Sequence, residues 1–408
     1  MNNFLRKWIT ISFFNLLIVA SQGVVLRYKI EFYLPFVDQK YLLHSHSHFA
    51  FYGWITQTLM VLMIYYLSLK KGEQVYKKYN RLLFANLFTA YGMFISFIIQ
   101  GYALYSISFS TLSVFVSYIF AVYFWKDLNS LSEKRLCHSW FKAALIFSII
   151  SSIGAFGLAF MMANKISNPD WYLTAIYFFL HFQYNGWFFF AGMGLLVSKL
   201  ETIPAAVKNI RIIFLLFCAA CVPAYLLSVL WLPFPKIMYL FIVAAVIAQL
   251  LAWTMLIKVF LKNKLFISEQ FSKYGKILLL LSAIAFSIKL LLQTGSVHPA
   301  LSQLSYGFRP IIIGYLHLVL LAVTSIFIIG YIISFELVPV SKKLITGVFI
   351  FVAGIIINEL LLLVQGLAAL TYVYIPYINI LLLIAALTLF CGISIMLISR
   401  FKPGIAVK

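Results

Sequence analysis

Long apolar runs are the feature that most constrains how this chain can fold. Twelve of them have close to 20 residues or more, enough to cross the roughly 30 Å hydrocarbon core of a bilayer as a helix. They fall at 8–26, 43–69, 81–102, 105–125, 141–163, 171–198, 210–231, 236–261, 274–293, 310–335, 343–367 and 375–399. The alternating pattern that a membrane β-barrel needs is absent from the sequence. We therefore predict an all-α polytopic membrane protein of twelve transmembrane helices, forming one membrane domain over residues 1–408.

The basic residues are distributed as in a membrane protein, not as in a nucleic-acid-binding protein. Only 10% of the 408 residues are charged, yet the formal net charge is +21. Most of the 31 lysines and arginines fall in the segments that face inward when the N-terminus is inside. The positive-inside rule explains this bias, predicts that both termini are cytoplasmic, and leaves no reason to expect a nucleic-acid partner.

Three of the predicted helices carry histidines. His44, His46 and His48 lie near the start of the second helix, His181 lies on the sixth, and His317 lies on the tenth. An imidazole in hydrocarbon is costly, so it should face the bundle interior and hold something there. At 1.5 Å per residue, His48, His181 and His317 lie roughly 9, 15 and 11 Å below the outer ends of their helices. The shared depth favours a haem or metal role over three unrelated buried histidines.

The three histidines of the second helix cannot all face the same way. His44 and His48 are four residues apart and share a helix face, while His46 points roughly opposite. His48 is the deepest and is the preferred ligand, with His46 as the alternative and His44 at the level of the lipid headgroups. A competing interpretation is that the HSHSH sequence only caps the helix at the membrane interface.

The spacing of the histidines also predicts an internal repeat. Four helices separate successive histidine helices, so helices 1–4, 5–8 and 9–12 would form three arcs. The sequences HFAFYGW and HFQYNGW support this, because Gly53 and Gly186 each follow a histidine by five residues. The third arc does not contain this sequence.

This plan resembles the catalytic subunit of the haem–copper oxidase superfamily, and its nitric oxide reductase branch most of all. By that resemblance, His48 or His46 matches the helix-two ligand of the low-spin haem. His317 matches the second histidine of the family's H-x-H motif on helix ten, whose first place is here Tyr315. His181 matches a helix-six ligand of the copper or non-haem iron.

The sequence departs from the family at the second metal. Helix seven, 210–231, contains no histidine where the family has a His-His pair. Asn185 stands where the reductase branch carries a glutamate. The resemblance therefore implies one low-spin b-type haem for electron transfer, with an incomplete second metal site. Because tyrosine can ligate haem iron, Tyr315 is a candidate ligand for a second haem.

Two cysteines on helix seven offer another metal site. Cys218 and Cys221 are three residues apart and share a helix face. Together with His181 they would suit copper(I), which prefers soft thiolate ligands. The alternative is that they are small hydrophobic residues, as free cysteines in apolar helices commonly are.

Four charged residues in or beside the helices complete the set of candidates. Glu359 lies in the middle of helix eleven and Lys289 within helix nine, so they are candidates for a buried pair or, for Glu359, a proton path. Snorkelling towards the interface is the alternative for Lys289. Arg27 lies at the outer end of the first predicted helix, and Arg309 lies just before the tenth, also at the outer side. There they would clamp haem propionates or bind lipid headgroups.

These expectations combine into one hypothesis. The chain would be a haem-binding protein of a bacterial inner membrane that transfers electrons or handles oxygen or nitric oxide. Its electrons would come from a quinol or from a donor at the outer face. Full reductase activity would need a partner subunit or unusual ligands to complete the second metal site. The alternative, from another functional class, is a haem or copper transporter or assembly factor on the same scaffold. A third is a structural subunit without a cofactor.

Overall fold

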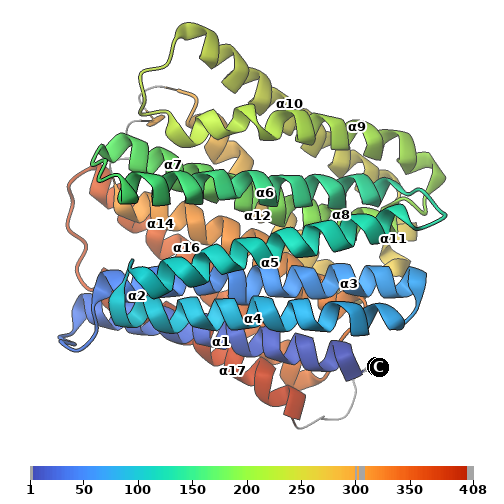
Figure 1. Ribbon diagram of the computed structural model, residues 1–408, viewed down its shortest axis with the longest axis horizontal. Helices are drawn as coiled ribbons and strands as arrows, with labels where there is room; N and C mark the ends of the chain where they lie inside the picture. The colour runs from blue at the N-terminus through green and yellow to red at the C-terminus, as the bar shows by residue number, and fades with distance from the viewer. Residues whose placement is uncertain (1–2, 299–300, 303–307, 402–408) are drawn as a thin grey trace. The chain divides into compact units, whose positions relative to one another are not determined.

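The computed structural model describes residues 3–298, 301–302 and 308–401, and every regular element in these ranges is a helix (Figure 1). Among the described residues, ten helices are long and apolar enough to cross a membrane. An eleventh span is added if the bent pair Ala206–Cys221 and Pro223–Val229 is counted as one. The prediction of an all-helical, multi-pass membrane protein is confirmed, and its apolar helices indicate a bilayer environment.

The predicted count of twelve spans differs from this result at two places. The sixth segment, 171–198, is not among the candidate spans because His181, Gln183 and Asn185 lower its hydropathy. The seventh, 210–231, is bent by 45°. The bend occurs at Pro223, which has no N–H to continue the helical hydrogen bonds.

The chain divides into two compact units. The first comprises Met1–Phe120, Lys273–Ser282 and Phe308–Lys408. Its elements are α1 (Asn3–Glu31), α2 (Gln39–Phe49), η1 (Ala50–Thr56), α3 (Gln57–Lys71), α4 (Gln74–Gln100), α14 (Arg309–His317), η4 (Leu318–Ser325), α15 (Ile326–Ser334), α16 (Lys342–Leu370) and α17 (Ile378–Phe401), with the first parts of α5 (Leu104–Asn129) and α12 (Lys273–Gly295).

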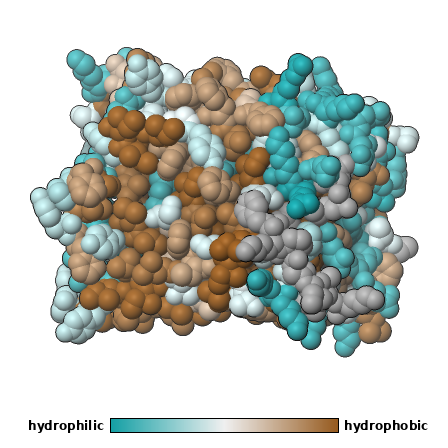
Figure 2. All heavy atoms as spheres, turned by 90° about the horizontal axis from the view of Figure 1, so that it is seen from below, coloured by the Kyte–Doolittle hydropathy of each residue, from teal (hydrophilic) through white to brown (hydrophobic). Residues whose placement is uncertain are grey.

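Close helix contacts in the first unit depend on small residues. A Cβ added to Gly392 of α17 would lie 2.5 Å from the Phe351 nitrogen of α16, so only glycine permits this crossing. Membrane helices commonly approach each other through such residues. Figure 2 shows the face that includes α1 and α17, where apolar residues cover most of the surface and hydrophilic residues gather at the end where α1 begins.

The second unit comprises Ala121–Ser272 and Ala283–Gly307. Its elements are α6 (Leu136–Ala163), α7 (Pro169–His181), η2 (Phe182–Phe188), α8 (Phe189–Leu200), α9 (Pro204–Cys221), η3 (Pro223–Val229), α10 (Lys236–Lys262) and α11 (Lys264–Gln270), with the remaining parts of α5 and α12. Aromatic side chains pack its interior. The buried Trp140 ring lies 5.3 Å from Phe190 and 5.2 Å from Phe214, measured between centroids.

Candidate functional site

Each of the three histidine segments changes from α-helix to π-helix within two residues of a histidine. The π-helix η1 begins two residues after His48, η2 begins directly after His181, and η4 begins directly after His317. A π-helix is rare, and in proteins it frequently marks a functional site. The recurrence supports the predicted threefold repeat, and it includes the third arc, in which the glycine sequence is missing.

Polar side chains hold the two π-helices of the first unit. The Trp54 indole N–H of η1 donates to Ser325 Oγ of η4 at 2.9 Å, so the two segments are in direct contact. The buried Asn15 of α1 donates from Nδ2 to the Gly53 carbonyl of η1 at 2.6 Å. A π-helix leaves carbonyls without their usual α-helical partners, and the bond from Asn15 satisfies one such group.

His46 and His317 have the same hydrogen-bonding arrangement. His46 Nδ1 lies 3.0 Å from the Val19 carbonyl oxygen, and His317 Nδ1 lies 2.9 Å from that of Ile313. A carbonyl only accepts, so in both rings Nδ1 carries the proton and Nε2 carries a lone pair. Neither Nε2 is hydrogen-bonded to a described residue, and both imidazoles are partly exposed. Two Nε2 atoms are therefore available as ligands.

The two histidines share a charged environment in the first unit. His46 and Arg27 are close enough to His317 to act on it electrostatically, and Arg27 acts on His46 as well. Arg309 and Glu359 in turn act on Arg27. Neither arginine forms an ion pair with a described residue. Two guanidinium groups against one carboxylate make this a region that would attract anionic groups.

His48, the ligand preferred from the sequence, has a different environment. Its Nε2 lies 3.0 Å from the Tyr102 hydroxyl, and its ring stacks on Phe97 with centroids 4.4 Å apart. His44 is beside it, with its ring 4.6 Å from that of Tyr102. The alternation of faces agrees with these contacts, but it is His46, the alternative ligand, that lies close enough to His317 to interact with it electrostatically.

Tyr315, the candidate ligand for a second haem, lies on α14 two residues before His317. Two residues correspond to about 200° of rotation around an α-helix, so the two side chains leave α14 on nearly opposite sides. Tyr315 is therefore not part of the face that carries the His317 ring.

His181, in the second unit, is a fully buried histidine with both ring nitrogens in use. Its Nε2–H donates to the Cys221 carbonyl at 2.9 Å. Its Nδ1 accepts from Asn185 Nδ2 at 3.1 Å and is 3.4 Å from Ser228 Oγ. The Cys221 carbonyl lies at the bend between α9 and η3, where a helical partner is missing. His181 therefore supplies a hydrogen bond that the broken helix lacks.

The predicted copper ligands do not come together as a set. Cys221 meets His181 through its backbone carbonyl, and its thiol is 3.8 Å from the Asn185 carbonyl. Cys218 is only partly buried and is a free cysteine. Over the described part of the chain, no three His, Cys, Asp or Glu side chains are placed to hold a metal ion.

Lys289 and Glu359 each have neighbours in their own unit. Lys289 is 2% exposed, its Nζ lies 5.1 Å from the centre of the Phe286 ring, and it interacts electrostatically with Cys221. It does not snorkel to the surface. Glu359 accepts a hydrogen bond from Asn358 Nδ2 at 3.1 Å. A pair between Lys289 and Glu359, and a proton path through Glu359, stay predictions.

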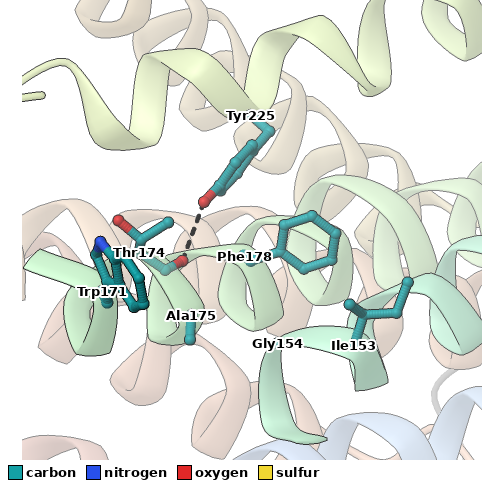
Figure 3. Close-up of a pocket in the computed structure, with 7 residues that line it drawn as sticks. All are labelled: Ile153, Gly154, Trp171, Thr174, Ala175, Phe178 and Tyr225. Atoms are coloured by element: carbon teal, nitrogen blue, oxygen red, sulfur yellow. Dashed lines mark hydrogen bonds between the residues drawn. The ribbon is translucent and has the colours of Figure 1, made fainter. Parts of the chain in front are cut away.

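An apolar pocket of about 360 Å³ lies in the second unit (Figure 3). It is lined by Ile153 and Gly154 of α6, by Trp171, Thr174, Ala175 and Phe178 of α7, and by Tyr225 of η3. The Tyr225 hydroxyl donates to the Thr174 carbonyl at 3.0 Å, which joins η3 to α7. The lining contains no charged side chain and no histidine or cysteine.

Sequence reasoning missed several residues that position the histidines. Asn15 is a buried amide in a mainly apolar helix, and a polar side chain at that depth was an available signal. Tyr102 follows Gly101, whose φ of 61° turns the chain back towards α2. The carbonyls of Val19 and Ile313 could not have been identified, because any residue type provides a carbonyl.

The sequence matches no protein family model and no curated protein.

Proposed function

We propose that this protein binds one b-type haem in its first unit, through Nε2 of His46 and Nε2 of His317, and uses it for electron transfer. When bound by two imidazoles, such a haem carries one electron between its ferric and ferrous states. The proposal includes the family resemblance, a bacterial inner membrane as the location, and a quinol or an outer-face donor as the source of electrons.

One observation carries the proposal: in both His46 and His317 the ring Nδ1 is hydrogen-bonded to a backbone carbonyl. Histidines that bind metals usually donate their second ring N–H to a carbonyl or carboxylate, which fixes the tautomer and orients the ring. Both histidines do so, and both leave Nε2 without a hydrogen bond to a described residue. His181 is the internal comparison, because its two nitrogens are both bonded and it has no free ligand atom.

The surrounding charges also fit a haem. A haem has two propionates, and arginine pairs with carboxylates in a bidentate manner. Arg27 and Arg309 lie close enough to interact with each other and have no ion-pair partner among the described residues. Binding an anionic group between them would relieve their repulsion. Arg27 would orient the propionates beside both histidines, while Glu359 would limit the net positive charge.

The experiment that tests the proposal is the visible spectrum of the purified protein, oxidised and then reduced with dithionite, with metal analysis of the same sample. We expect one iron per chain and a sharp α-band at the position typical of b-type haems on reduction. A folded but colourless protein would contradict the proposal and direct attention to the transporter alternative, which metal-dependent flux in vesicles would test. Bound copper or non-haem iron beside the haem would point instead to a reductase.

Replacing Arg27 by glutamine should weaken haem retention without changing its ligands. A hydrogen bond between charged groups contributes on the order of 1.5–3 kcal/mol, so haem should be lost to an acceptor protein at least tenfold faster. The reduced spectrum should keep its low-spin shape. Arg309→Gln, at an exposed position, should show a smaller effect in the same direction. Lys29→Gln is the control, since Lys29 donates to the Leu34 carbonyl. Equal rates in Arg27→Gln and the control would show that Arg27 does not contact the haem.

A further inference from the structure

The HSHSH sequence contains two histidines that the proposed haem does not use. His44 and His48 are one helical turn apart on α2 and both pack against Tyr102 and Phe97. This cluster lies on the opposite side of α2 from His46, so it is a separate feature of the first unit.

One nitrogen in this cluster is buried without a partner. His44 Nε2 is shielded from solvent and has no hydrogen bond to any residue that the structure describes. A buried polar atom of this kind is costly, and natural proteins rarely leave one without a purpose. Beside it, His48 Nε2 and the Tyr102 hydroxyl are 3.0 Å apart. Three atoms that can carry lone pairs therefore belong to Tyr102 and to two histidines that each contact it.

We propose that His44, His48 and Tyr102 form a binding site for a divalent transition-metal ion, for which Zn²⁺ is the probe. Two histidines at positions i and i+4 of a helix are the spacing with which H-E-x-x-H helices bind zinc. Tetrahedral zinc has nitrogen and oxygen ligands at about 2.0–2.2 Å, which places neighbouring ligand atoms about 3.3 Å apart. The distance of 3.0 Å between His48 Nε2 and Tyr102 Oη is close to that separation.

The electrostatics of the cluster come from two further residues. Asp38, which caps the start of α2, attracts a cation towards His44, whereas Lys40 opposes it. The metal would replace the hydrogen bond between His48 and Tyr102, and water would complete the tetrahedron. With two imidazoles and one phenol as protein ligands, the site would bind and release its metal readily and would be sensitive to pH.

The test is a zinc titration of the protein, prepared with a non-histidine affinity tag, treated with a chelator and followed by competition with a zinc-binding dye. We expect one site whose affinity falls at least about tenfold in His44→Ala and in His48→Gln, which is a loss of about 1.4 kcal/mol or more. The zinc affinity of Tyr102→Phe should lie between that of the wild type and those of the two histidine variants. Thermal unfolding checks that each variant is folded.

Two controls make the result specific. His298 is an exposed histidine outside the helices, so His298→Ala should leave the affinity unchanged. His46→Ala should lose haem but keep zinc, which separates this site from the proposed haem function. Zinc binding of equal strength in wild type, His44→Ala and His48→Gln would overturn the proposal, and so would the absence of binding to the folded wild type.

Discussion

Alanine in place of His46 or of His317 should abolish the low-spin haem spectrum. Under the proposal, each substitution removes one of the two imidazole nitrogens that would hold the haem. Loss of more than about 1.4 kcal/mol of binding free energy lowers affinity at least tenfold, so purified variants should contain a small fraction of the wild-type haem. The measurement is the haem-to-protein ratio together with the reduced spectrum.

His48→Ala is the matched control for this experiment. It removes an imidazole from the same helix, two residues away, but one that is hydrogen-bonded to Tyr102 and stacked on Phe97. We expect this variant to keep its haem and its low-spin spectrum. The opposite result, in which His48→Ala loses haem and His46→Ala retains it, would restore the ligand preferred from the sequence and contradict the assignment made from the geometry.

The fold was largely predictable because hydrocarbon imposes a strong pattern on sequence. A span needs a long apolar run whatever it packs against, and each of the twelve predicted runs is helical over most of its length. The sixth and seventh segments were harder for opposite reasons. The polar residues around His181 lower the apolar signal of one, and Pro223 bends the other. Division of the chain into two units depends on contacts far apart in sequence, which periodicity does not reveal.

The sequence predicted which helices carry the candidate histidines, but not which face of each helix points into the bundle. The alternation of His44, His46 and His48 follows from helix geometry, so the sequence could say that only one face enters the bundle. Which face does so depends on where α1 packs, and that is settled by contacts such as the bond from His46 to the Val19 carbonyl. Depth alone favoured His48, although depth carries no information about direction.

The π-helices were missed for a related reason. A π-helix has no composition of its own, and the apolar residues of η4 would fit an ordinary α-helix equally well. The signal lies in the partners, such as Asn15 bonding to the Gly53 carbonyl. These hydrogen-bond partners can be identified only when the position of α1 against η1 is known. The three π-helices, which begin within two residues of His48, His181 and His317, then support the predicted repeat where the glycine sequence does not.

His181→Ala should destabilise the protein strongly and leave its metal content unchanged. The side chain is 0% exposed, and its removal would leave the Cys221 carbonyl and the Asn185 amide without their hydrogen-bond partner. Each buried group left in this way costs about 1–3 kcal/mol, so we expect a loss of about 2–5 kcal/mol in unfolding free energy. Denaturant unfolding in detergent measures it.

The same variant decides between a structural and a metal-binding role for the second unit. His298→Ala, at an exposed position, should change stability by no more than about 0.5 kcal/mol and serves as the control. Cys218→Ser tests the thiol nearest to Cys221 in sequence, and it should alter neither copper content nor stability by much.

If His181→Ala and Cys218→Ser both lost a stoichiometric copper ion while keeping wild-type stability, His181 would be a ligand. Its two occupied ring nitrogens favour the structural role, because Nε2–H already donates to the Cys221 carbonyl at the bend between α9 and η3 and Nδ1 already accepts from Asn185.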